Sequence, residues 1–323
     1  MPLIMKFNDP NFDETFQSFL DLKRDTNNDV DTLVSEIISE VRVRGDDALT
    51  DYTKSFDHYN LSNKNMSLNK LQIDAGYANC KESTLDALEL AYERIKSFHE
   101  KQRPENIKYT DSAGVSLKYR WNAIDSVGLY VPGGRASYPS SLLMNAVPAL
   151  VAGVPRLALC VPSPEGVVSP LILAAAKICS IDEIYCIGGA QAVAALAYGT
   201  KTIEPVCKIV GPGNSYVASA KRQVFGDVGI DNIAGPSEIL VVSDKNNNPD
   251  WIAIDLLSQA EHDPCAQAIL VADDESFVDR VVECINTRLT ALKRKEIASA
   301  SWENYGAIII VNDFCEALPL INE

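Results

Sequence analysis

Two side chains able to bind a metal ion lie close together near the end of a predicted helix, in the segment LSQAEHDP (257–264). Gln259 and His262 are three residues apart, which places them about 60° apart on one helical face. Imidazole is a frequent zinc ligand, but glutamine is a poor one, and zinc usually takes four ligands, so this pair supplies only half a site. On the residues alone, a histidine that caps the C-terminal end of a helix is the favoured interpretation.

Three glycine-rich segments each follow a predicted strand and precede a predicted helix. They are YVPGGRASYPSS (130–141), IGGAQAVA (187–194) and VGPGNSYVA (210–218). Glycine at such a junction lets backbone N–H groups approach an anion at the helix N-terminus. None matches the GxGxxG fingerprint, and a tight turn explains any one of them, but three in one sheet favour a cofactor or phosphorylated ligand.

A few polar side chains in these segments are well placed to face a ligand. They are Tyr130, Gln191 and Asn214. The alternatives are a strand-end tyrosine with a hydrated hydroxyl, a glutamine in a first helical turn and a helix N-cap, and for Asn214 the N-cap is favoured. Ser237, in the segment GPSE, is open to the same doubt, because a turn or cap explains a serine there.

Alternating strand and helix patterns position these segments. From Ser126 onward, strand-like runs such as VGLYV (127–131) alternate with helical runs across short glycine-rich links, which predicts right-handed βαβ units and a mostly parallel sheet covered on both faces. A second α/β stretch follows GPSE and reaches the end of the chain. Residues 11–103 have mainly helical periodicity, and VSLKYRW (115–121) alternates like a strand.

Composition excludes several classes of function. The formal net charge of −15 repels a phosphate backbone, so we expect no binding to nucleic acid or to anionic membranes. The N-terminus lacks the apolar run of a signal peptide, and no window reaches the length of a membrane span, so a cytoplasmic location is expected. The eight cysteines form no CxxC pair and are interpreted as small core residues rather than disulfides or a zinc knuckle.

The order of these segments resembles that of histidinol dehydrogenases. The likeness is carried by GLYVPGGRASYPSSLLMNAVPALVAGV, IGGAQAVAALAYGT, KIVGPGNSYVASAKRQVFGDVGID, AGPSEILVV and DLLSQAEHDPCAQAIL. It covers nearly the whole chain and is strongest from Val127 to Val271. A set of long segments in one order is far more specific than a single glycine loop.

Together with the change of pattern near Ser126, the resemblance implies an α/β fold of two Rossmann-like, doubly wound domains, one inserted in the other, with a helical N-terminal arm. The arm is predicted at residues 1–25. Residues 26–126 and 237–323 are predicted to form the first domain, which is incomplete at its C-terminus. Residues 127–236 are predicted to form the inserted NAD-binding domain.

The resemblance also implies an activity: oxidation of L-histidinol to L-histidine through histidinaldehyde, with two NAD and one zinc per active site, as the last step of histidine biosynthesis in a homodimer. By position, Tyr130, Gln191 and Asn214 would bind NAD. Ser237 would contact the substrate, and Gln259 and His262 would bind both zinc and substrate. The resemblance therefore reverses the interpretation of His262 as a capping residue.

The chain departs from the family after LINE (320–323), which ends at Glu323. Family members continue there into a Pro-Glu-His sequence that supplies the catalytic base pair, and then into further zinc ligands, an aspartate and a histidine. The Glu-His pair is thus expected beyond Glu323, and we expect a truncated chain with no catalytic base of its own and little activity alone. The alternatives are a non-catalytic protein that binds a nucleotide or pairs with a full-length subunit on this scaffold, and an NAD-dependent dehydrogenase of a different amino alcohol.

Overall fold

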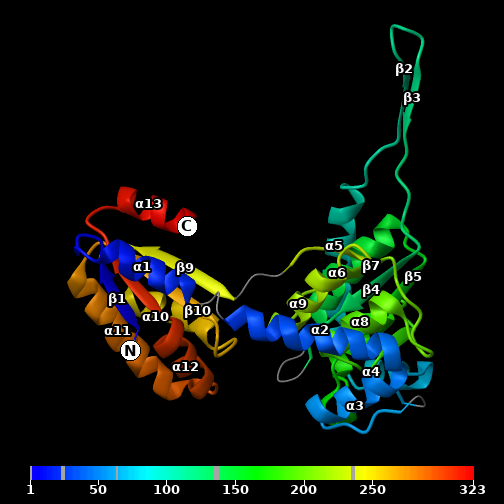
Figure 1. Cartoon of the computed structure of the whole chain (residues 1–323), viewed down its shortest axis with the longest axis horizontal. Coiled ribbons are helices and arrows are strands. Elements are labelled where there is room, and N and C mark those ends of the chain that lie inside the picture. The colour runs from blue at the N-terminus through cyan, green and yellow to red at the C-terminus, as the bar shows by residue number, and fades with distance from the viewer. Residues whose placement is uncertain (1, 23–25, 63–64, 134–137, 234–236) are drawn as a thin grey trace. The chain divides into compact units, whose positions relative to one another are not determined.

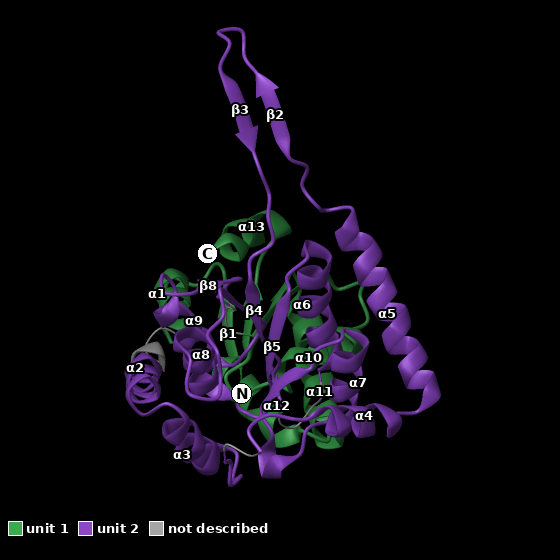
Figure 2. Ribbon diagram, turned by 90° about the vertical axis from the view of Figure 1, so that its right-hand side faces the viewer, with its two compact units in different colours: residues 1–27, 235–323 green, residues 28–234 purple. Residues whose placement is uncertain are grey.

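The computed structural model forms two compact units (Figures 1 and 2). Unit 1 comprises residues 1–27 and 235–323, and unit 2 comprises residues 28–234. The structure describes residues 2–22, 26–62, 65–133, 138–233 and 237–323. Part of the first glycine-rich segment (134–137) and the AGP that precedes Ser237 (234–236) lie outside the described residues.

Unit 2 is built on a five-stranded parallel sheet with the strand order β6-β5-β4-β7-β8. The strands are β4 (Ser126–Tyr130), β5 (Arg156–Cys160), β6 (Glu183–Tyr185), β7 (Lys208–Val210) and β8 (Gly229–Ile230). The chain moves outward from β4 to β6 and then returns to the other side of β4. The strand order therefore reverses between β4 and β7, and ligands of open α/β sheets bind at the carboxyl ends of strands at such a point.

Helices cover both faces of this sheet. One face is covered by α6 (Pro139–Ala152) and α7 (Pro170–Ile178), with α4 (Lys70–Ala78) and α5 (Glu82–Glu100) packed against them. The other is covered by α8 (Gly189–Tyr198) and α9 (Ser215–Val224), with α2 (Thr26–Arg44) and α3 (Asp46–Phe56). Alternate strand residues face the two cores, as Leu129 and Leu159 face the first and Ala158 and Cys160 the second.

Unit 1 contains a four-stranded parallel sheet with the order β1-β11-β10-β9. Its strands are β1 (Leu3–Lys6), β9 (Glu238–Ser243), β10 (Gln267–Ala272) and β11 (Ala307–Ile310). The helices α10 (Pro249–Ala260), α11 (Glu275–Ala291) and α12 (Lys295–Tyr305) pack on one face, and α1 (Phe12–Asp21) and α13 (Phe314–Asn322) pack on the other. Successive strand residues again face opposite sides of the sheet, so Leu270 packs in the core beneath α10, α11 and α12, and Val271 packs in the core beneath α1 and α13.

A β-hairpin formed by β2 (Ile107–Thr110) and β3 (Ser116–Tyr119) extends away from the rest of unit 2 (Figure 2). The two strands pair with each other and with no other strand that the structure describes. Every residue from Lys101 to Asp125 is exposed. The sequence prediction of a strand at 115–121 is thus met by β3, but in an isolated ribbon rather than in a core sheet.

The units are grouped differently from the predicted domains. Residues 28–126 pack around the sheet of unit 2 rather than with residues 237–323, because the apolar faces of α2, α3, α4 and α5 are buried against the helices that flank that sheet. The expected helical arm at residues 1–25 contributes a strand as well as a helix, since β1 pairs in parallel with β11 and buries Met5. The alternation β–α from Ser126 to the end is confirmed, with α12 as an addition that the pattern did not predict.

The cysteines divide by position. Cys160, Cys179 and Cys186 are buried, as expected of core residues, and burial raises the pKa of each thiol. The core interpretation is wrong for Cys207, Cys265 and Cys315, which are exposed because they lie at or beyond the ends of strands and helices.

No helix in the described part of the chain combines the length and the apolar composition that a membrane crossing requires.

Candidate functional site

The three residues predicted to bind NAD lie at the carboxyl end of the unit 2 sheet. Tyr130 is the last residue of β4, Gln191 is in the first turn of α8 after β6, and Asn214 is the N-cap of α9 after β7. Because carboxyl ends of parallel strands share one edge, the three side chains belong to neighbouring loops at the point where strand order reverses.

Glycines allow these loops to approach one another closely. A Cβ added to Gly133 would lie 2.6 Å from the carbonyl oxygen of Pro162, and one added to Gly188 would lie 2.5 Å from the Pro162 ring. A Cβ on Gly211, which has a φ of 119°, would overlap the carbonyl oxygen of Tyr130. The loops after β4, β5, β6 and β7 therefore form a backbone-lined cradle that side chains at these positions would fill.

Tyr130 lies within this cradle as a buried phenol. Its hydroxyl oxygen accepts a hydrogen bond of 3.1 Å from the backbone N–H of Gly189, which leaves the hydroxyl proton free to be donated. Burial raises the pKa of Tyr130, so the group is a neutral donor at physiological pH. Tyr130 thus links β4 to the start of α8, and its hydroxyl proton is not donated to any of the described residues.

Gln191 is buried without a full set of partners. The side chain is 2% exposed, and its Oε1 atom accepts no hydrogen bond from the described residues. A buried amide oxygen without a partner costs about 1–3 kcal/mol, so such atoms in native proteins normally meet a ligand or water. This orphaned acceptor is the observation that most directly indicates a ligand at the cradle.

Asn214 behaves as the residues alone predict. Its Oδ1 accepts a hydrogen bond of 3.2 Å from the Val217 N–H and caps α9. The residue is exposed, so its amide NH2 group remains available beside the α9 N-terminus.

A buried lysine beneath the third glycine loop was not predicted from the sequence. Lys221, only 2% exposed, donates to the carbonyl oxygen of Gly211 at 2.9 Å and forms an ion pair with Asp231. Asp231 in turn accepts a hydrogen bond of 2.8 Å from the Gly211 N–H. Both backbone polar groups of Gly211 are therefore fixed by one ion pair. A signal existed: Lys221 occupies the same helical stripe as the buried Val217 and Val224.

A second residue that was not predicted is Asp57, which follows α3. Its carbonyl oxygen accepts a hydrogen bond of 3.1 Å from the N–H of Glu165, in the loop after β5. Its Oδ2 atom is buried and has no hydrogen-bond partner among the described residues. Burial raises the pKa of Asp57, with His58 opposing the shift. No pattern in the sequence distinguishes this aspartate from an ordinary helix-end residue.

The three candidate residues of unit 1 lie at the amino end of its sheet. Ser237 directly precedes β9, and its carbonyl oxygen accepts a hydrogen bond of 2.9 Å from the N–H of Gln267, the first residue of β10. Gln259 and His262 lie at the end of α10, which returns from the carboxyl end of β9 to the start of β10. The predicted order of strand, helix and strand already implies this edge, because Ser237 precedes the first strand and the end of the helix leads into the second.

His262 does not cap the helix through its side chain. The helix ends at Ala260, the N–H of His262 donates to the Gln259 carbonyl oxygen at 3.1 Å, and Arg294 donates to the His262 carbonyl oxygen at 3.1 Å. The imidazole is exposed and makes no hydrogen bond within the described part of the chain. The expectation from the residues alone is therefore wrong, because backbone groups and Arg294 already complete this helix end.

The end of α10 supplies only part of a zinc coordination sphere. Gln259 and His262 offer one neutral amide oxygen and one imidazole nitrogen, whereas zinc usually takes four ligands. Among the residues that the structure describes, no three His, Cys, Asp or Glu side chains are placed to hold a metal ion together. These residues by themselves do not fit a zinc centre.

Glu323, beyond which the catalytic Glu-His pair is predicted, directly follows α13. Its side chain is exposed, and its Oε2 atom accepts a hydrogen bond of 3.2 Å from Nε2 of Gln17 in α1. Glu323 therefore joins the two helices that cover one face of the unit 1 sheet, and nothing in this contact suggests a catalytic role. The position of the base pair beyond Glu323 stays a prediction, and no described residue is assigned as the base.

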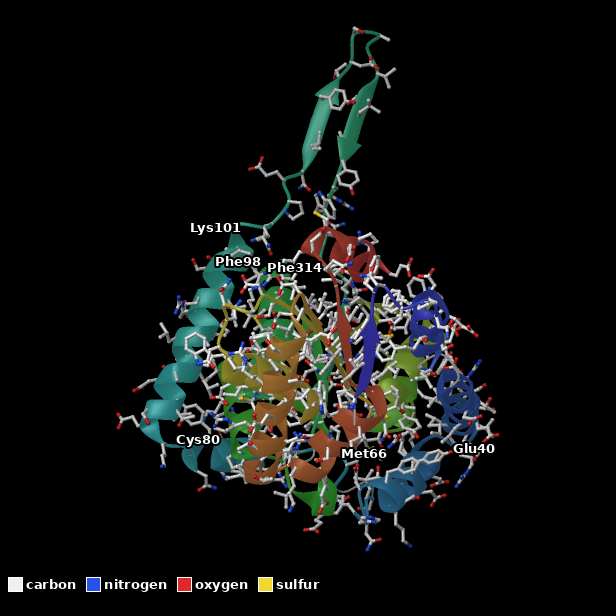
Figure 3. The ribbon with its side chains drawn as sticks, turned by 90° about the vertical axis from the view of Figure 1, so that its left-hand side faces the viewer. Glu40, Met66, Cys80, Phe98, Lys101 and Phe314 are labelled. Carbon is white, nitrogen blue, oxygen red and sulfur yellow. The ribbon has the colours of Figure 1, made fainter. Side chains whose placement is uncertain are left out.

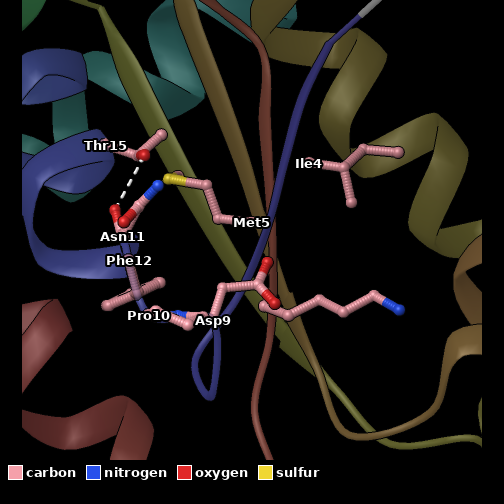
Figure 4. A pocket seen from close by; sticks show the side chains of 8 residues that line it. Ile4, Met5, Asp9, Pro10, Asn11, Phe12 and Thr15 are labelled. Atoms are coloured by element: carbon pink, nitrogen blue, oxygen red, sulfur yellow. Dashed lines mark hydrogen bonds between the residues drawn. The ribbon is translucent and has the colours of Figure 1, made fainter.

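Two shallow hollows of the described surface lie elsewhere. One, of about 230 Å³, lies between β1 and α1 and is lined by Met5, Asp9 and Phe12 among others (Figure 4). The other, of about 350 Å³, is lined by Tyr77, Tyr92 and Lys177 among others. Lys177 pairs with Asp74 and lies over the Tyr77 ring, so its charge is already used. Neither hollow contains a candidate site residue.

Comparison with known proteins decides the family. Residues 21–323 match the sequence profile of histidinol dehydrogenase. The chain is 55% identical to the histidinol dehydrogenase of Brucella suis over 322 residues, which cover 100% of this chain and 75% of that protein. This chain belongs to the histidinol dehydrogenase family. Histidinol dehydrogenase 1 of Nostoc is 56% identical over 321 residues, covering 99% of this chain and 74% of that protein.

A solved structure supports the assignment at the level of the fold. The crystal structure of histidinol dehydrogenase from Elizabethkingia anophelis aligns with a TM-score of 0.79 and 35% sequence identity, covering 90% of this chain and 67% of that one. The α/β fold with two parallel sheets is therefore that of histidinol dehydrogenases. The chain spans about three quarters of the length of the curated relatives named above.

Proposed function

We propose that this chain takes part in the oxidation of L-histidinol to L-histidine through histidinaldehyde, with two NAD, as the last step of histidine biosynthesis. Family membership supports the reaction, and the orphaned Oε1 atom of Gln191 in the glycine-lined cradle supports the nucleotide site. In the same proposal the functional assembly is a homodimer, and unit 2 is a Rossmann-like nucleotide-binding domain, consistent with its strand order.

NAD is proposed to lie over the cradle of unit 2. Tyr130 would donate a hydrogen bond through its free hydroxyl proton, Gln191 would accept one through Oε1, and the amide of Asn214 would contact the dinucleotide at the α9 N-terminus. When bound, NAD supplies the hydride acceptor. The Lys221–Asp231 pair would keep the Gly211 loop in the shape that the dinucleotide requires, without contacting it.

The substrate is proposed to use unit 1, with Ser237, Gln259 and His262 as its contacts and the latter two as zinc ligands. The described residues supply only two metal donors at this position, and the catalytic base pair is predicted beyond Glu323. We therefore propose that the 323-residue chain binds zinc weakly and turns over histidinol slowly or not at all.

Gln191→Met provides a sharp test of the nucleotide site. Methionine fills a similar volume but removes the orphaned oxygen, so we expect the free protein to gain about 1 kcal/mol in stability while its affinity for NADH, measured by fluorescence titration, falls about tenfold. The exposed Gln102 gives a matched control, and Gln102→Met should change neither quantity. Unchanged NADH affinity in Gln191→Met would refute the proposed role.

The metal and substrate proposal is tested by zinc content and histidinol-dependent NADH formation. We expect less than one zinc per chain after dialysis and turnover near background. Robust NADH formation by the purified 323-residue chain would overturn the proposal of weak activity. An affinity for zinc that is unchanged by His262→Ala would overturn the assignment of His262 as a ligand.

A non-catalytic nucleotide-binding protein that pairs with a full-length subunit is the second candidate. It is favoured by the contrast between the well-formed cradle of unit 2 and the two-donor metal position of unit 1. NADH binding without turnover, even after addition of zinc and of a full-length family member inactivated at its own site, would support this candidate. Turnover of a different amino alcohol but not of histidinol would instead indicate another dehydrogenase.

A further inference from the structure

Asp57 lies on the connection that follows α3, and this connection is held against two loops of the cradle. The Asp57 carbonyl oxygen accepts a hydrogen bond of 3.1 Å from the N–H of Glu165, in the loop after β5. Met66, labelled in Figure 3, is buried further along the chain, and its carbonyl oxygen accepts a hydrogen bond of 2.8 Å from the Cys186 N–H directly after β6. Two backbone hydrogen bonds therefore fix this connection at the carboxyl end of the unit 2 sheet.

The backbone is in an uncommon conformation on both sides of the contact between Asp57 and Glu165. His58, which follows Asp57, has a φ of 51°, and Glu165 has a φ of 56°. Both angles lie in the left-handed region that favours glycine, and in the described part of the chain Ser180 is the one other non-glycine residue found there. Such conformations cost energy and are concentrated at ligand sites. Their meeting at one hydrogen bond indicates that the position of Asp57 matters for more than folding.

The carboxylate of Asp57 is uncompensated. Its Oδ2 atom is buried and accepts no hydrogen bond from the described residues. Burial raises the pKa of Asp57, and the neighbour that opposes this shift is His58 rather than a lysine or an arginine. A buried polar oxygen without a partner costs stability and normally meets a ligand or water. With the Oε1 atom of Gln191, Asp57 thus brings a second orphaned oxygen to the loops of the cradle.

Asp57 also lies within electrostatic reach of Tyr130. Burial is the main cause that raises the pKa of Tyr130, the hydrogen bond from Gly189 opposes the shift, and the charges of Cys160 and Asp57 increase it. Cys160 is the last residue of β5 and pairs in register with Tyr130 at the end of β4. The Asp57 carboxylate is therefore near the carboxyl ends of these two neighbouring strands.

A carboxylate beside the second strand has a specific use in doubly wound sheets that bind dinucleotides. The pyrophosphate lies at the helix that follows the first strand, and an acidic side chain further along accepts a hydrogen bond from the 2′-hydroxyl of the adenosine ribose. A 2′-phosphate at the same place is repelled by a carboxylate and requires a cation such as arginine. In unit 2, β4 is the first strand of the parallel sheet and β5 is the second.

The uncompensated carboxylate thus occurs where a bound dinucleotide would have its adenosine ribose. We propose that Asp57 accepts a hydrogen bond from the 2′-hydroxyl of NAD and that its charge excludes the 2′-phosphate of NADP. Asp57 is then the residue that determines which dinucleotide the cradle takes. This inference rests on the nucleotide site of the proposed function and adds a residue that decides its specificity.

Asp57→Asn tests the proposal through the affinities of the 323-residue chain for NADH and NADPH, both measured by fluorescence titration. The neutral amide loses the charge-assisted hydrogen bond and the repulsion of the phosphate. We expect NADH binding to weaken about tenfold and NADPH binding to strengthen about tenfold, so that the ratio of the two affinities changes about 100-fold. The variant should remain folded, because it removes an uncompensated charge, and thermal unfolding checks this.

Glu165→Gln is the matched control. Glu165 is an acidic residue on the same loop, but its side chain is exposed, and its N–H is the group that contacts Asp57. Removal of this exposed charge should change the ratio of NADH to NADPH affinity by about threefold or less. A change as large as that of Asp57→Asn would show that the net charge of the loop, and not a contact of Asp57, excludes the phosphate.

The hydrogen bond itself is tested with two fragments of the cofactor that differ only in the 2′-hydroxyl. Both 5′-AMP and 2′-deoxy-5′-AMP are allowed to compete with NADH. In the unsubstituted chain 5′-AMP should bind about tenfold more tightly than its deoxy form, and in Asp57→Asn the preference should fall to about threefold or less. A preference of equal size in both proteins would refute a contact between Asp57 and the 2′-hydroxyl.

The two levels of the proposal fail in different ways. An unsubstituted chain that binds no NADH would refute the nucleotide site and, with it, the role of Asp57. NADH binding by the unsubstituted chain, with an unchanged ratio of NADH to NADPH affinity in Asp57→Asn, would refute the role of Asp57 and leave the nucleotide site intact. Equal affinities of the unsubstituted chain for NADH and NADPH would overturn the exclusion of the 2′-phosphate.

Discussion

Replacement of Lys221 by methionine should destabilise unit 2 far more than replacement of its neighbour Arg222. Lys221 is buried, and it joins the Gly211 carbonyl oxygen to Asp231. Methionine retains most of the apolar stem but removes the charge. Asp231 then stays 28% exposed beside an apolar group, and the Gly211 carbonyl oxygen loses its donor.

The magnitude follows from these two losses. Breaking a buried ion pair by removing one partner costs about 3–5 kcal/mol, and the partial exposure of Asp231 reduces this, while the lost hydrogen bond adds about 1 kcal/mol. We therefore expect Lys221→Met to lower the free energy of unfolding by about 3 kcal/mol. For a unit of this size that corresponds to a decrease in melting temperature of about 6–12 °C.

Arg222 provides the matched control on the same helix. It pairs with Asp31, but its side chain is 47% exposed, so Arg222→Met should cost about 1 kcal/mol or less. In Lys221→Met/Asp231→Asn the buried charge is removed while the amide oxygen still accepts from the Gly211 N–H, and about half of the loss should be recovered. Calorimetric unfolding measures all three variants.

The result that would refute this reasoning is a Lys221→Met protein as stable as Arg222→Met. It would mean that the lysine is not buried with Asp231 in solution. A large loss of stability without recovery in the double variant would show that the packing of the lysine stem, rather than its charge, is what matters.

Further predictions concern the glycine cradle, the buried aspartate and the nucleotide donor. Gly211→Ala should lower the free energy of unfolding by about 3 kcal/mol or more, because the added methyl group would overlap the Tyr130 carbonyl oxygen. Gly153→Ala is the control, since no atom lies within 4 Å of the added methyl group, and it should cost about 1 kcal/mol. Thermal unfolding compares the two variants, and equal costs would contradict the close approach of Gly211 to the Tyr130 carbonyl oxygen. Burial raises the pKa of Asp57 in the folded chain, so the folded state binds the carboxyl proton more tightly than the unfolded state. The destabilisation caused by burying the charged carboxylate is therefore absent at low pH. It appears as the pH rises above the pKa that Asp57 has in the unfolded chain, and it is complete above the pKa that Asp57 has in the folded chain. At pH 7, Asp57→Asn should therefore raise the free energy of unfolding by about 1 kcal/mol, with a higher melting temperature, and this gain should vanish near pH 3. A gain in stability that is the same at both pH values would show that the charge of Asp57 is not its cause. Tyr130→Phe should weaken NADH binding several-fold and, because the Gly189 N–H loses its acceptor, lower the free energy of unfolding by about 1 kcal/mol; retention of full NADH affinity would exclude a hydroxyl contact.

The sequence predicted local elements well, because their signals are local. Asn248 caps α10 as its pattern indicates, with Pro249 in the first turn, and the glycine-rich links fall between strands and helices as expected. The sequence does not predict in the same way which sheet each helix packs against. The amphipathic faces of α2 and α5 require burial but do not specify against which sheet, so the grouping of residues 28–126 could not be predicted from periodicity.

In the candidate site too, the sequence predicts where residues lie in the elements but not how they pack. The positions of Tyr130, Gln191 and Asn214 at strand ends and helix starts follow from the alternation of elements. The orphaned oxygen of Gln191 and the burial of Lys221 depend on packing between segments distant in the chain, which residue patterns do not contain. For Lys221 the apolar stripe of α9 gave a usable indication, but a lysine in a helix is ordinarily solvated and so is easily discounted.

The location of Ser237 and His262 on the segments that lead into strands has a practical consequence for labelling. At the opposite edge of the unit 1 sheet, the carboxyl ends of the strands lead into connections such as the turn after β9. In this turn Asp244 accepts hydrogen bonds from Asn246 and Asn247 at the surface. A short peptide tag or a fluorophore attached in this turn would be separated by the full length of β9 from Ser237. Unit 1 can therefore carry a reporter at one edge while the residues proposed for metal and substrate remain unaltered at the other.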